Sequence, residues 1–498
     1  MNTDPTETES VRHWRVERAD EFSLIVDASD YFKALRKVIR ASRQQLLLIG
    51  WDFDLEIEML PGESDADGLA PDGLPNKLGP FLEKVVEVQS ELHIYMLKWN
   101  GSVLVAPGRL APTLGLAVLG SERIHLALDG HHPFGACHHQ KIVVADDQIA
   151  FCGGIDATES RWDTSEHLPD DPRRVDKKGE PTAPWHDVTS SVSGPAAAAL
   201  GNLSRHRWLR ARGETLAPPT PAKDSIWPDD LKVDAENIDV AIARTEPPFD
   251  GAPLRNEIEE AFLAGIREAK HTIYIESQYF AAETVCAAIE ARLSEENGPQ
   301  VVVINPEYAL SEFEDDAMHE LRDRAVARLI EKDVHDHFRI YFPVTVAGQP
   351  IYVHAKVFIV DGVDLHIGSA NMNNRSMGFD TECNVIVMAQ RDAVSDMQDR
   401  LLAEHLGVSQ TEFRKTLEKE GTLIDTIGAL NGKSGRRLRD LKKRPSNMRS
   451  AMLADTRLMD PRYHPNEDTS TGQGIRPRHL GLVAGAVALG WIIWKKFR

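Results

Sequence analysis

Short runs of apolar residues recur in both halves of the chain, each bounded by polar or glycine-containing segments. Runs of this length, rich in Val, Ile and Leu, are typical of buried β-strands, and the intervening stretches rich in Ala, Leu, Glu and Arg predict helices. In the first half the expected strands are 45–53, 92–97, 123–128, 141–145 and 149–152. In the second half they are 272–277, 300–305, 338–342, 356–360, 365–368 and 384–388. This order predicts two α/β lobes of similar plan.

Changes in composition mark the expected boundaries of the lobes. The stretch 216–232 contains four prolines, which favours a surface connection over a core element. A second polar stretch, 169–184, predicts a long loop of the kind that tends to serve function. The expected organisation is a polar lead-in at 1–30, lobes at 31–215 and 241–420, a Pro-rich connection at 216–240, a basic polar segment at 421–475 and an apolar tail at 476–498.

One motif occurs twice, with a constant offset of 215 residues, and so reveals an internal repeat. Each copy has a histidine, a lysine two positions on, an aspartate five positions after the lysine, and a glycine after six further residues. The copies are His139, Lys141, Asp146 and Gly153, and His354, Lys356, Asp361 and Gly368. Two copies in the same register are not explained by chance, so the motif is expected to carry chemistry.

The pairing of histidine with lysine suits the cleavage of a phosphodiester. Residues two apart on a strand point to the same face, so His139 lies beside Lys141, and His354 beside Lys356. If the lobes pack about a pseudo-twofold axis, two imidazoles and two ammonium groups meet in one cleft. Lysines would neutralise the phosphate oxygens, one imidazole would attack phosphorus, and the other would protonate the leaving alcohol.

The second copy, "VHAKVFIVDGVDLHIGSANMNNRSMGFDTE", resembles the signature of the phospholipase D superfamily, specifically its phospholipid-cleaving branch. The first copy matches with "GGID" in place of "GSAN". The segments "IESQYF" (275–280) and "PWHDV" (184–188) are similar to further segments of phospholipases D. The resemblance covers about residues 30–410. It implies a bilobal fold of two mixed-sheet α/β lobes about a pseudo-twofold axis, with no metal and no cofactor.

The resemblance also implies roles for single residues. His139 is expected to be the nucleophile and His354 the general acid, although the sequence alone leaves the opposite assignment open. Lys141 and Lys356 would bind phosphate, with Asn371 and Asn373 as neutral donors. In the first lobe Asp156 stands where the second has Asn371, and a carboxylate cannot donate to a phosphate oxygen.

The resemblance further implies that a downstream carboxylate orients each catalytic imidazole. Glu382, in "FDTEC", is the candidate for one lobe, and Asp163, in "SRWDT", is the candidate for the other. Asp146 and Asp361 belong to the repeated motif, but they are expected to organise the turn after the strand rather than to touch substrate.

A zinc site competes with this interpretation at the first motif. The stretch "HHPFGACHHQK" contains His131, His132, Cys137 and His138 in addition to His139. Such a cluster could ligate zinc. In the second copy only His139 has a histidine counterpart, so the repeat favours phosphodiester chemistry over metal binding.

Charge and cysteine content narrow the remaining possibilities. A net charge of −20 argues against non-specific nucleic-acid binding, which requires a positive field. The four cysteines, Cys137, Cys152, Cys286 and Cys383, lack C-x-x-C spacing and indicate reduced thiols in the cytoplasm. The first 20 residues lack the basic and apolar regions of a cleavable secretory signal.

The C-terminal region suggests contact with a membrane. An uncharged run from Leu480 to Trp494 is flanked by basic residues and would extend for only about 22 Å as a helix, so the sequence does not decide between spanning and lying in the membrane. A buried C-terminal helix is the alternative. Upstream, residues 433–449 hold eight basic residues and one acidic residue, a composition that suits anionic lipid headgroups. A solvated helix face remains the alternative for this cluster.

The leading hypothesis is a cytoplasmic, membrane-associated phospholipase D. It would hydrolyse the distal phosphodiester of a glycerophospholipid to phosphatidic acid and a headgroup alcohol through a phosphohistidine. A phosphatidyl transferase such as a cardiolipin-synthase-like enzyme is the first alternative. A nuclease of the superfamily is weakened by the acidic charge, and a non-enzymatic binding module is weakened by the intact His–Lys pairs.

Overall fold

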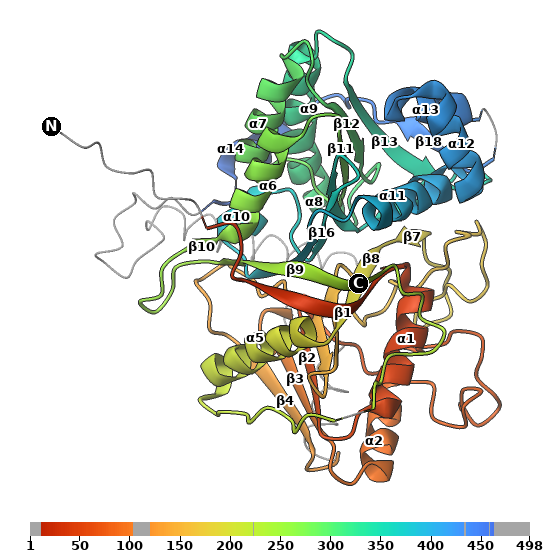
Figure 1. Ribbon diagram of the computed structural model, residues 1–498, viewed down its shortest axis with the longest axis vertical. Helices are drawn as coiled ribbons and strands as arrows, with labels where there is room; N and C mark the ends of the chain where they lie inside the picture. Colours follow the sequence, from red (N-terminus) through yellow and green to blue (C-terminus); the bar gives the residue numbers. More distant parts are fainter. Residues whose placement is uncertain (1–10, 103–119, 223, 433–434, 458, 463–498) are drawn as a thin grey trace, which may run out of the picture.

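Two long antiparallel strands, β1 (Arg15–Val26) and β9 (Ala235–Glu246), form the centre of the fold (Figure 1). This computed structural model describes residues 11–102, 120–222, 224–432, 435–457 and 459–462. Along the central pair Phe22 lies opposite Ala235. Each of the two strands belongs to one half of the sheet. The two lobes therefore share one continuous mixed sheet, which a repeat of two separate lobes did not predict.

The first half of the sheet extends outward from β1 and contains six further strands. They are β2 (Gln45–Gly50), β3 (His93–Trp99), β4 (Ile124–Asp129), β5 (Ile142–Ala145), β6 (Ile149–Gly153) and β8 (Val188–Ser193). Their spatial order from β1 is β8, β6, β5, β2, β3 and β4. The strands β2, β5 and β6 are buried along their whole length, which explains their continuous apolar sequences.

The second half repeats this plan outward from β9. Its strands are β11 (Thr272–Ser277), β12 (Gln300–Ile304), β13 (Phe338–Val344), β15 (Lys356–Val360), β16 (Asp364–Gly368), β17 (Glu382–Val387) and β18 (Arg437–Asp440). From β9 the order is β17, β16, β15, β11, β12, β13 and β18, and the short β10 (Arg255–Asn256) also pairs with β9. Apart from β18 and β10, the order matches that of the first half strand for strand, as a pseudo-twofold repeat requires.

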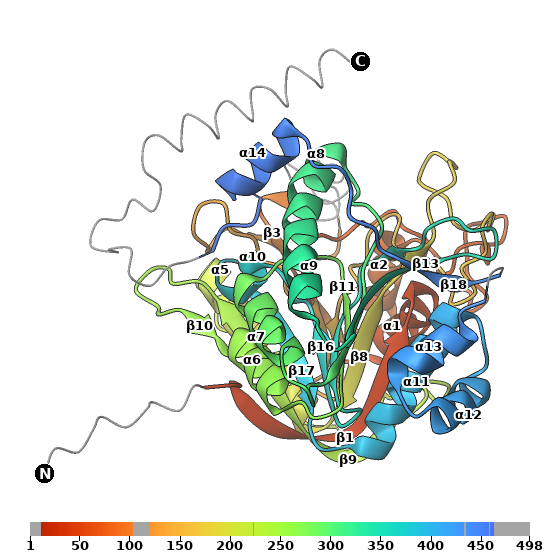
Figure 2. The ribbon, with the colours of Figure 1, turned by 90° about the horizontal axis from the view of Figure 1, so that it is seen from above.

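Helices cover both faces of each half of the sheet (Figures 1 and 2). The first half carries α1 (Ala28–Ala41), α2 (Leu78–Val88) and α5 (Pro195–Arg212). The second half carries α6 (Glu257–Glu268), α7 (Glu283–Leu293), α8 (Glu312–Glu314), a π-helix (Asp315–His319), α9 (Glu320–Lys332), α10 (Asn374–Gly378), α11 (Arg391–Leu406), α12 (Gln410–Glu420), α13 (Leu423–Leu430) and α14 (Met448–Thr456). Figure 2 shows α6, α7 and α9 on one side of the second half and α11 to α13 on the other.

A second, two-stranded sheet joins the lobes. Its strands β7 (Trp185–His186) and β14 (Tyr352–Val353) run parallel and come from different halves of the chain. Between the end of α5 and the start of β9, the described residues form no helix or strand, in keeping with a proline-rich connection. All four cysteines are buried and unbridged.

Part of the basic segment forms ion pairs with carboxylates elsewhere in the chain. Arg436 lies 2.6 Å from Glu404, Arg444 lies 2.6 Å from Asp315, and Arg449 lies 3.1 Å from Asp316. These three arginines pair with carboxylates of the chain, and binding of the basic cluster to lipid headgroups stays a prediction. The predicted tail at 476–498 lies outside the described residues. Within the described part of the chain, no helix combines the length and apolar character needed to cross a bilayer.

Candidate active site

Each motif histidine is held by a segment of the opposite lobe. The amide of His139 donates to the carbonyl of Thr381 at 2.9 Å, and the amide of His354 donates to the carbonyl of His186 at 2.8 Å. These two contacts are equivalent under the pseudo-twofold repeat. They bring the two motifs together at the boundary between the lobes, although 215 residues separate the motifs in sequence.

The imidazole of His139 faces the carboxylate of Glu382. Its Nδ1 lies 3.0 Å and 3.1 Å from the two carboxylate oxygens. Glu382 is fully buried and also accepts hydrogen bonds from Ser369 Oγ at 2.5 Å and Ser376 Oγ at 2.7 Å. A carboxylate on Nδ1 places the proton there and leaves the lone pair of the neutral ring on Nε2. His139 is thus arranged to present a nucleophilic nitrogen.

The imidazole of His354 has the matching arrangement with Asp187. Its Nδ1 lies 2.7 Å from Asp187 Oδ2, and the amide of Val188 donates to Oδ1 at 2.8 Å. Burial raises the pKa of Asp187. The pKa of His354 is well below its usual value, because the ring is buried and lies near the cation of Lys356. Both effects favour the neutral form of His354.

Asp163 does not orient His354, contrary to the sequence-based expectation. Its carboxylate accepts hydrogen bonds from His167 Nδ1, Arg174 Nη1 and the amide of Trp185, each at 2.9 Å. The two orienting carboxylates do not stand at equivalent distances from the motifs in sequence. Glu382 follows His354 by 28 positions, whereas Asp187 follows His139 by 48 positions. The long loop before β7 accounts for the difference. The segment "PWHDV" contained the correct aspartate, Asp187, directly after a histidine.

The two motif lysines are buried beside the histidines. Lys141 Nζ lies 3.1 Å from Asp156 Oδ2 and donates to the carbonyl of His139 at 3.1 Å. Lys356 donates to the carbonyl of His354 in the same way. Burial lowers the pKa of Lys356 to about 7. Both ammonium groups are thus fixed next to the imidazoles, where a phosphate would bind.

Asn371 and Asp156 occupy equivalent positions of the repeat and share an unusual feature. Asn371 Oδ1 and Asp156 Oδ1 are both buried without a hydrogen-bond partner among the described residues. Buried polar atoms of this kind are rare unless a ligand or water completes them. Asn373, by contrast, caps α10, because its side chain accepts a hydrogen bond from the amide of Ser376 at 3.1 Å.

The motif aspartates Asp146 and Asp361 bind backbone rather than imidazole. Asp146 accepts from the amides of residues 43, 44 and 45 at 2.7–2.9 Å, before β2. Asp361 accepts from the amides of residues 270, 271 and 272 at 2.7–2.9 Å, before β11. Both have a positive φ, of 51° and 53°. These contacts fix the turn after each motif strand, as the sequence analysis expected of them.

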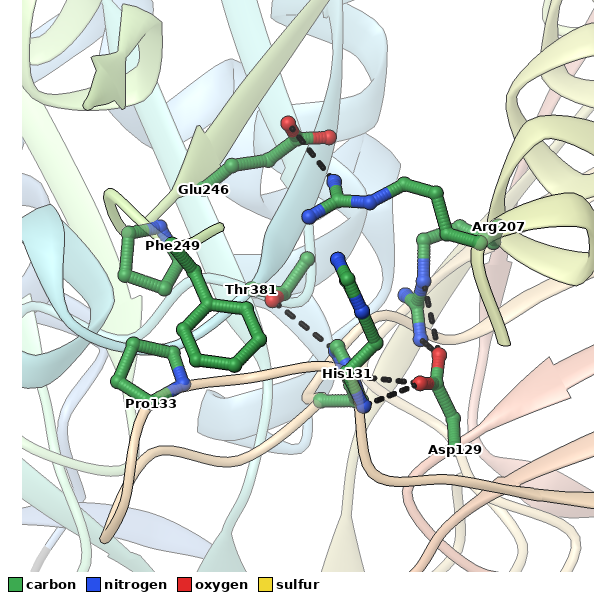
Figure 3. Close-up of a pocket in the computed structure, with 10 residues that line it drawn as sticks. Asp129, His131, Pro133, Arg207, Glu246, Phe249 and Thr381 are labelled. Carbon is green, nitrogen blue, oxygen red and sulfur yellow. Dashed lines mark hydrogen bonds and ion pairs between the residues drawn. The ribbon is translucent and has the colours of Figure 1, made fainter. Parts of the chain in front are cut away.

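The histidines of the first motif that suggested zinc each have separate partners. His138 contacts Thr381 Oγ1 at 3.0 Å and Asp129 Oδ1 at 3.1 Å through its two ring nitrogens. Asp129, His131 and His138 line a small pocket, which Figure 3 shows. In this pocket Arg207 binds Asp129. The ring of His131 lies 5.0 Å from that of Phe249. His138 therefore supports the segment that carries Glu382.

A cavity of about 420 Å³ is lined by Trp185, Tyr352 and Arg161, among other residues. The Trp185 ring, which lines it, lies 5.2 Å from the His354 ring and 4.6 Å from the Tyr352 ring. The guanidinium of Arg161 lies 4.2 Å above Trp185. Aromatic, apolar and charged side chains thus share this cavity, a mixture suited to an amphiphilic ligand.

Two family models match overlapping parts of the chain. The model described as "Phospholipase D" matches residues 129–287, and the model described as "Cardiolipin synthase, PLD-like domain" matches residues 262–403. Together they cover both copies of the motif. The chain belongs to the phospholipase D superfamily.

Relatives of this phospholipase D superfamily member are distant in sequence. "Phospholipase D A" of Dictyostelium discoideum is 22% identical over 80% of this chain and 35% of its own length. "Phospholipase D alpha 1" of Cynara cardunculus is 23% identical over 57% of this chain and 50% of its own length. The chain thus spans half or less of these curated relatives.

The crystal structure of phosphatidylserine synthase from Haemophilus influenzae is similar in fold. It covers 83% of this chain and 96% of its own chain, with a TM-score of 0.53 and 12% sequence identity. This likeness supports the superfamily fold and its two-lobed, mixed α/β plan.

Proposed function

We propose that this superfamily member is a phospholipase D, which hydrolyses the distal phosphodiester of a glycerophospholipid to phosphatidic acid and a headgroup alcohol. The main support is the reciprocal pairing of two imidazoles with two buried carboxylates, His139 with Glu382 and His354 with Asp187. Two equivalent His–carboxylate pairs suit a reaction in two halves, in which one imidazole is the nucleophile and the other transfers a proton.

In the first half-reaction His139 Nε2 attacks phosphorus. The bond from phosphorus to the headgroup oxygen breaks, and the protonated His354 donates its proton to that oxygen. The side chain of His139 is 16% exposed and that of His354 is 6% exposed, which supports His139 as the accessible nucleophile. Glu382 stabilises the positive charge that develops on the attacking ring.

Binding of the substrate prepares His354 for this role. An anionic phosphodiester between Lys141 and Lys356 offsets the positive field that lowers the pKa of His354. The proton needed for the leaving group is then held on His354 Nε2, with Asp187 on Nδ1. Removing a single donor from such a charge-stabilising set elsewhere costs about 3 kcal/mol in activation free energy.

In the second half-reaction the neutral His354 removes a proton from water. The resulting hydroxide attacks phosphorus, the bond to His139 breaks, and phosphatidic acid leaves. A primary alcohol in place of water gives a phosphatidyl alcohol by the same steps. Hydrolysis and transfer thus differ only in the acceptor.

We further propose that the enzyme is cytoplasmic and acts at a membrane surface. The apolar run of residues 480–494 and its basic flanks support this proposal. Lys442 and Lys443, in the basic segment, make no ion pair in the described structure and are available to anionic headgroups.

The full-length protein with mixed-headgroup liposomes, with and without ethanol, tests the proposed activity. We expect phosphatidic acid, diverted to phosphatidylethanol by ethanol, when the lipid products are identified by mass spectrometry. His139→Ala and His354→Ala should abolish both products. His366→Ala removes a buried histidine of β16 that packs against Phe358 and should retain them.

Other products would contradict the proposal. Cardiolipin or another exchanged lipid without phosphatidic acid would identify a transferase. Cleavage of nucleic acid with no change in any lipid would identify a nuclease.

A further inference from the structure

A second cluster of histidines and carboxylates lies behind the active site and takes no part in the chemistry above. It comprises Asp27, between β1 and α1; His167, in the long loop before β7; His186, in β7; and Glu404, in α11. The side chains of the first three are fully buried, and that of Glu404 is 9% exposed. The cluster joins both lobes.

The facing atoms of this cluster are spaced as metal ligands are. His186 Nδ1 lies 3.4 Å from Asp27 Oδ1 and 3.4 Å from Glu404 Oε1. His167 Nε2 lies 3.5 Å from Asp27 Oδ2 and 3.1 Å from Glu404 Oε1. Ligands about 2.1 Å from a tetrahedral Zn²⁺ are separated by about 3.4 Å. One ligand atom from each of the four residues lies within 4.8 Å of all the others.

His186 Nδ1 is an unsatisfied buried atom. It has no hydrogen-bond partner among the described residues, although two carboxylate oxygens lie at 3.4 Å. Imidazolium–carboxylate hydrogen bonds are about 2.7–2.9 Å long. The separation is thus too long for a direct hydrogen bond and fits an ion between the groups.

The outer nitrogens of both rings are fixed by further carboxylates. His167 Nδ1 lies 2.9 Å from Asp163 Oδ2, and His186 Nε2 lies 2.7 Å from Glu276 Oε2. Metal-bound histidines almost always donate their second N–H to a carboxylate, a carbonyl or water in this way. The bonds direct the other nitrogen of each ring toward the cluster. They also give Asp163 a function, which is to orient His167.

The charges around the cluster leave room for a divalent cation. Four buried carboxylates surround it: Asp27, Asp163, Glu276 and Glu404. Among the described residues, two arginines pair with them, Arg174 with Asp163 at 2.9 Å and Arg436 with Glu404 at 2.6 Å. With both imidazoles neutral, the four carboxylates and two arginines leave two negative charges, which one Zn²⁺ ion or two protons on His167 and His186 would balance. Arg436 uses one lone pair of Glu404 Oε1 and leaves another for a metal.

We infer that Asp27, His167, His186 and Glu404 form a structural Zn²⁺ site that braces the two lobes behind the catalytic cleft. Two imidazole nitrogens and two carboxylate oxygens are ligands that zinc accepts in tetrahedral geometry. The inference does not rest on the proposed lipid chemistry.

The site is connected to the catalytic carboxylate through the backbone. The amide of Asp187 donates to Asp27 Oδ1 at 3.2 Å, and the amide of Asp27 donates to the carbonyl of Asp187 at 2.8 Å. Asp27 has φ 64° and ψ 155°, a region that is nearly restricted to glycine. An ion on Asp27 would hold this strained residue, and with it the Asp187 that orients His354.

Metal analysis of the full chain, purified without an affinity tag and without chelators, tests the site. We expect about one equivalent of zinc by plasma mass spectrometry. The protein stripped with a chelator should take up one Co²⁺ and show the intense visible absorption of tetrahedral cobalt. His167→Ala and the nearly isosteric Glu404→Gln should both lose this uptake. His366→Ala, which removes a buried histidine outside the cluster, should keep it.

Circular dichroism of each variant separates loss of the site from loss of the fold. If Glu404→Gln keeps the wild-type spectrum and still binds the metal as tightly as the wild type, the inference is wrong. It is equally wrong if the stripped wild-type protein is folded and takes up neither Zn²⁺ nor Co²⁺. Zinc retained at one equivalent in both variants would place the metal elsewhere and also overturn it.

Discussion

Each motif histidine is paired with a carboxylate from the opposite lobe, and this pairing predicts the effect of Asp187→Asn on catalysis. The substitution keeps the size of the side chain but removes the charge that lies 2.7 Å from His354 Nδ1. Asn keeps only one acceptor oxygen, which the amide of Val188 requires, so its NH2 group would face Nδ1 and the ring would lose its fixed tautomer. A buried hydrogen bond to a charged group contributes about 1.5–3 kcal/mol. Since about 1.4 kcal/mol corresponds to a tenfold change in rate, kcat should fall about 10- to 150-fold.

The assay is release of the headgroup from a short-chain phosphatidylcholine at saturating concentration, with the melting temperature measured in parallel. Asp147→Asn is the matched control, because Asp147 is a largely buried aspartate paired with Arg205 at 2.8 Å and contacts neither imidazole. The control should keep kcat within about twofold of the wild type. A folded Asp187→Asn protein with kcat within about threefold of the wild type would refute the reasoning.

Three further predictions follow from burial and close packing. Because the phosphate-binding form of Lys356 is protonated and its pKa is about 7, kcat/KM should fall as the pH rises above about 7; a flat profile up to pH 9 would contradict this. In Gly154→Ala the added Cβ would lie 2.1 Å from Asp187 Oδ1, so kcat should drop at least about tenfold, whereas Gly428→Ala, which meets open space, should be neutral. Burial raises the pKa of Asp460 to about 6, so the folded state binds its proton more tightly than the unfolded state. Protonated Asp460 therefore contributes to the free energy of unfolding below pH 4. This contribution, about 3 kcal/mol, should be lost as the pH rises through 6. Denaturant unfolding of the wild type and Asp460→Asn at pH 4 and pH 7 checks this, and an equal difference in stability at both pH values would disprove it.

The apolar strands of the sheet could be predicted from the sequence, but the polar strands, including the central ones, could not. All eleven predicted strands overlap a strand of the structure, because each is an apolar run, and β2, β5, β6, β15 and β17 are buried along their whole length. The central strands β1, β8 and β9 were missed. The sequence of β1, "RVERADEFSLIV", has five charged residues, and that of β8, "VTSSVS", is rich in serine. Their positions depend on pairing between distant segments, which a local pattern does not encode.

The candidate site, too, could be predicted only as far as local sequence patterns reach. The repeat singled out His139, Lys141, His354 and Lys356, and the structure brings the two motifs to the boundary between the lobes; their catalytic roles stay predictions. The sequence indicated Asp163 in place of Asp187, because a longer loop in the first lobe shifts the carboxylate by 20 positions relative to the second. The exchange of carboxylates between lobes is a property of the tertiary fold and is not visible in either motif alone.

Trapping the covalent intermediate tests the central claim most directly. A phosphatidyl ester of p-nitrophenol has a leaving group that needs no proton, so His354→Ala should complete the first half-reaction and then stop for lack of a base. Alkaline quenching and peptide mass spectrometry should find the phosphatidyl group on His139 in this variant and no adduct in His139→Ala. No adduct in either variant, or an adduct on a residue outside the two motifs, would contradict the proposed phosphohistidine mechanism.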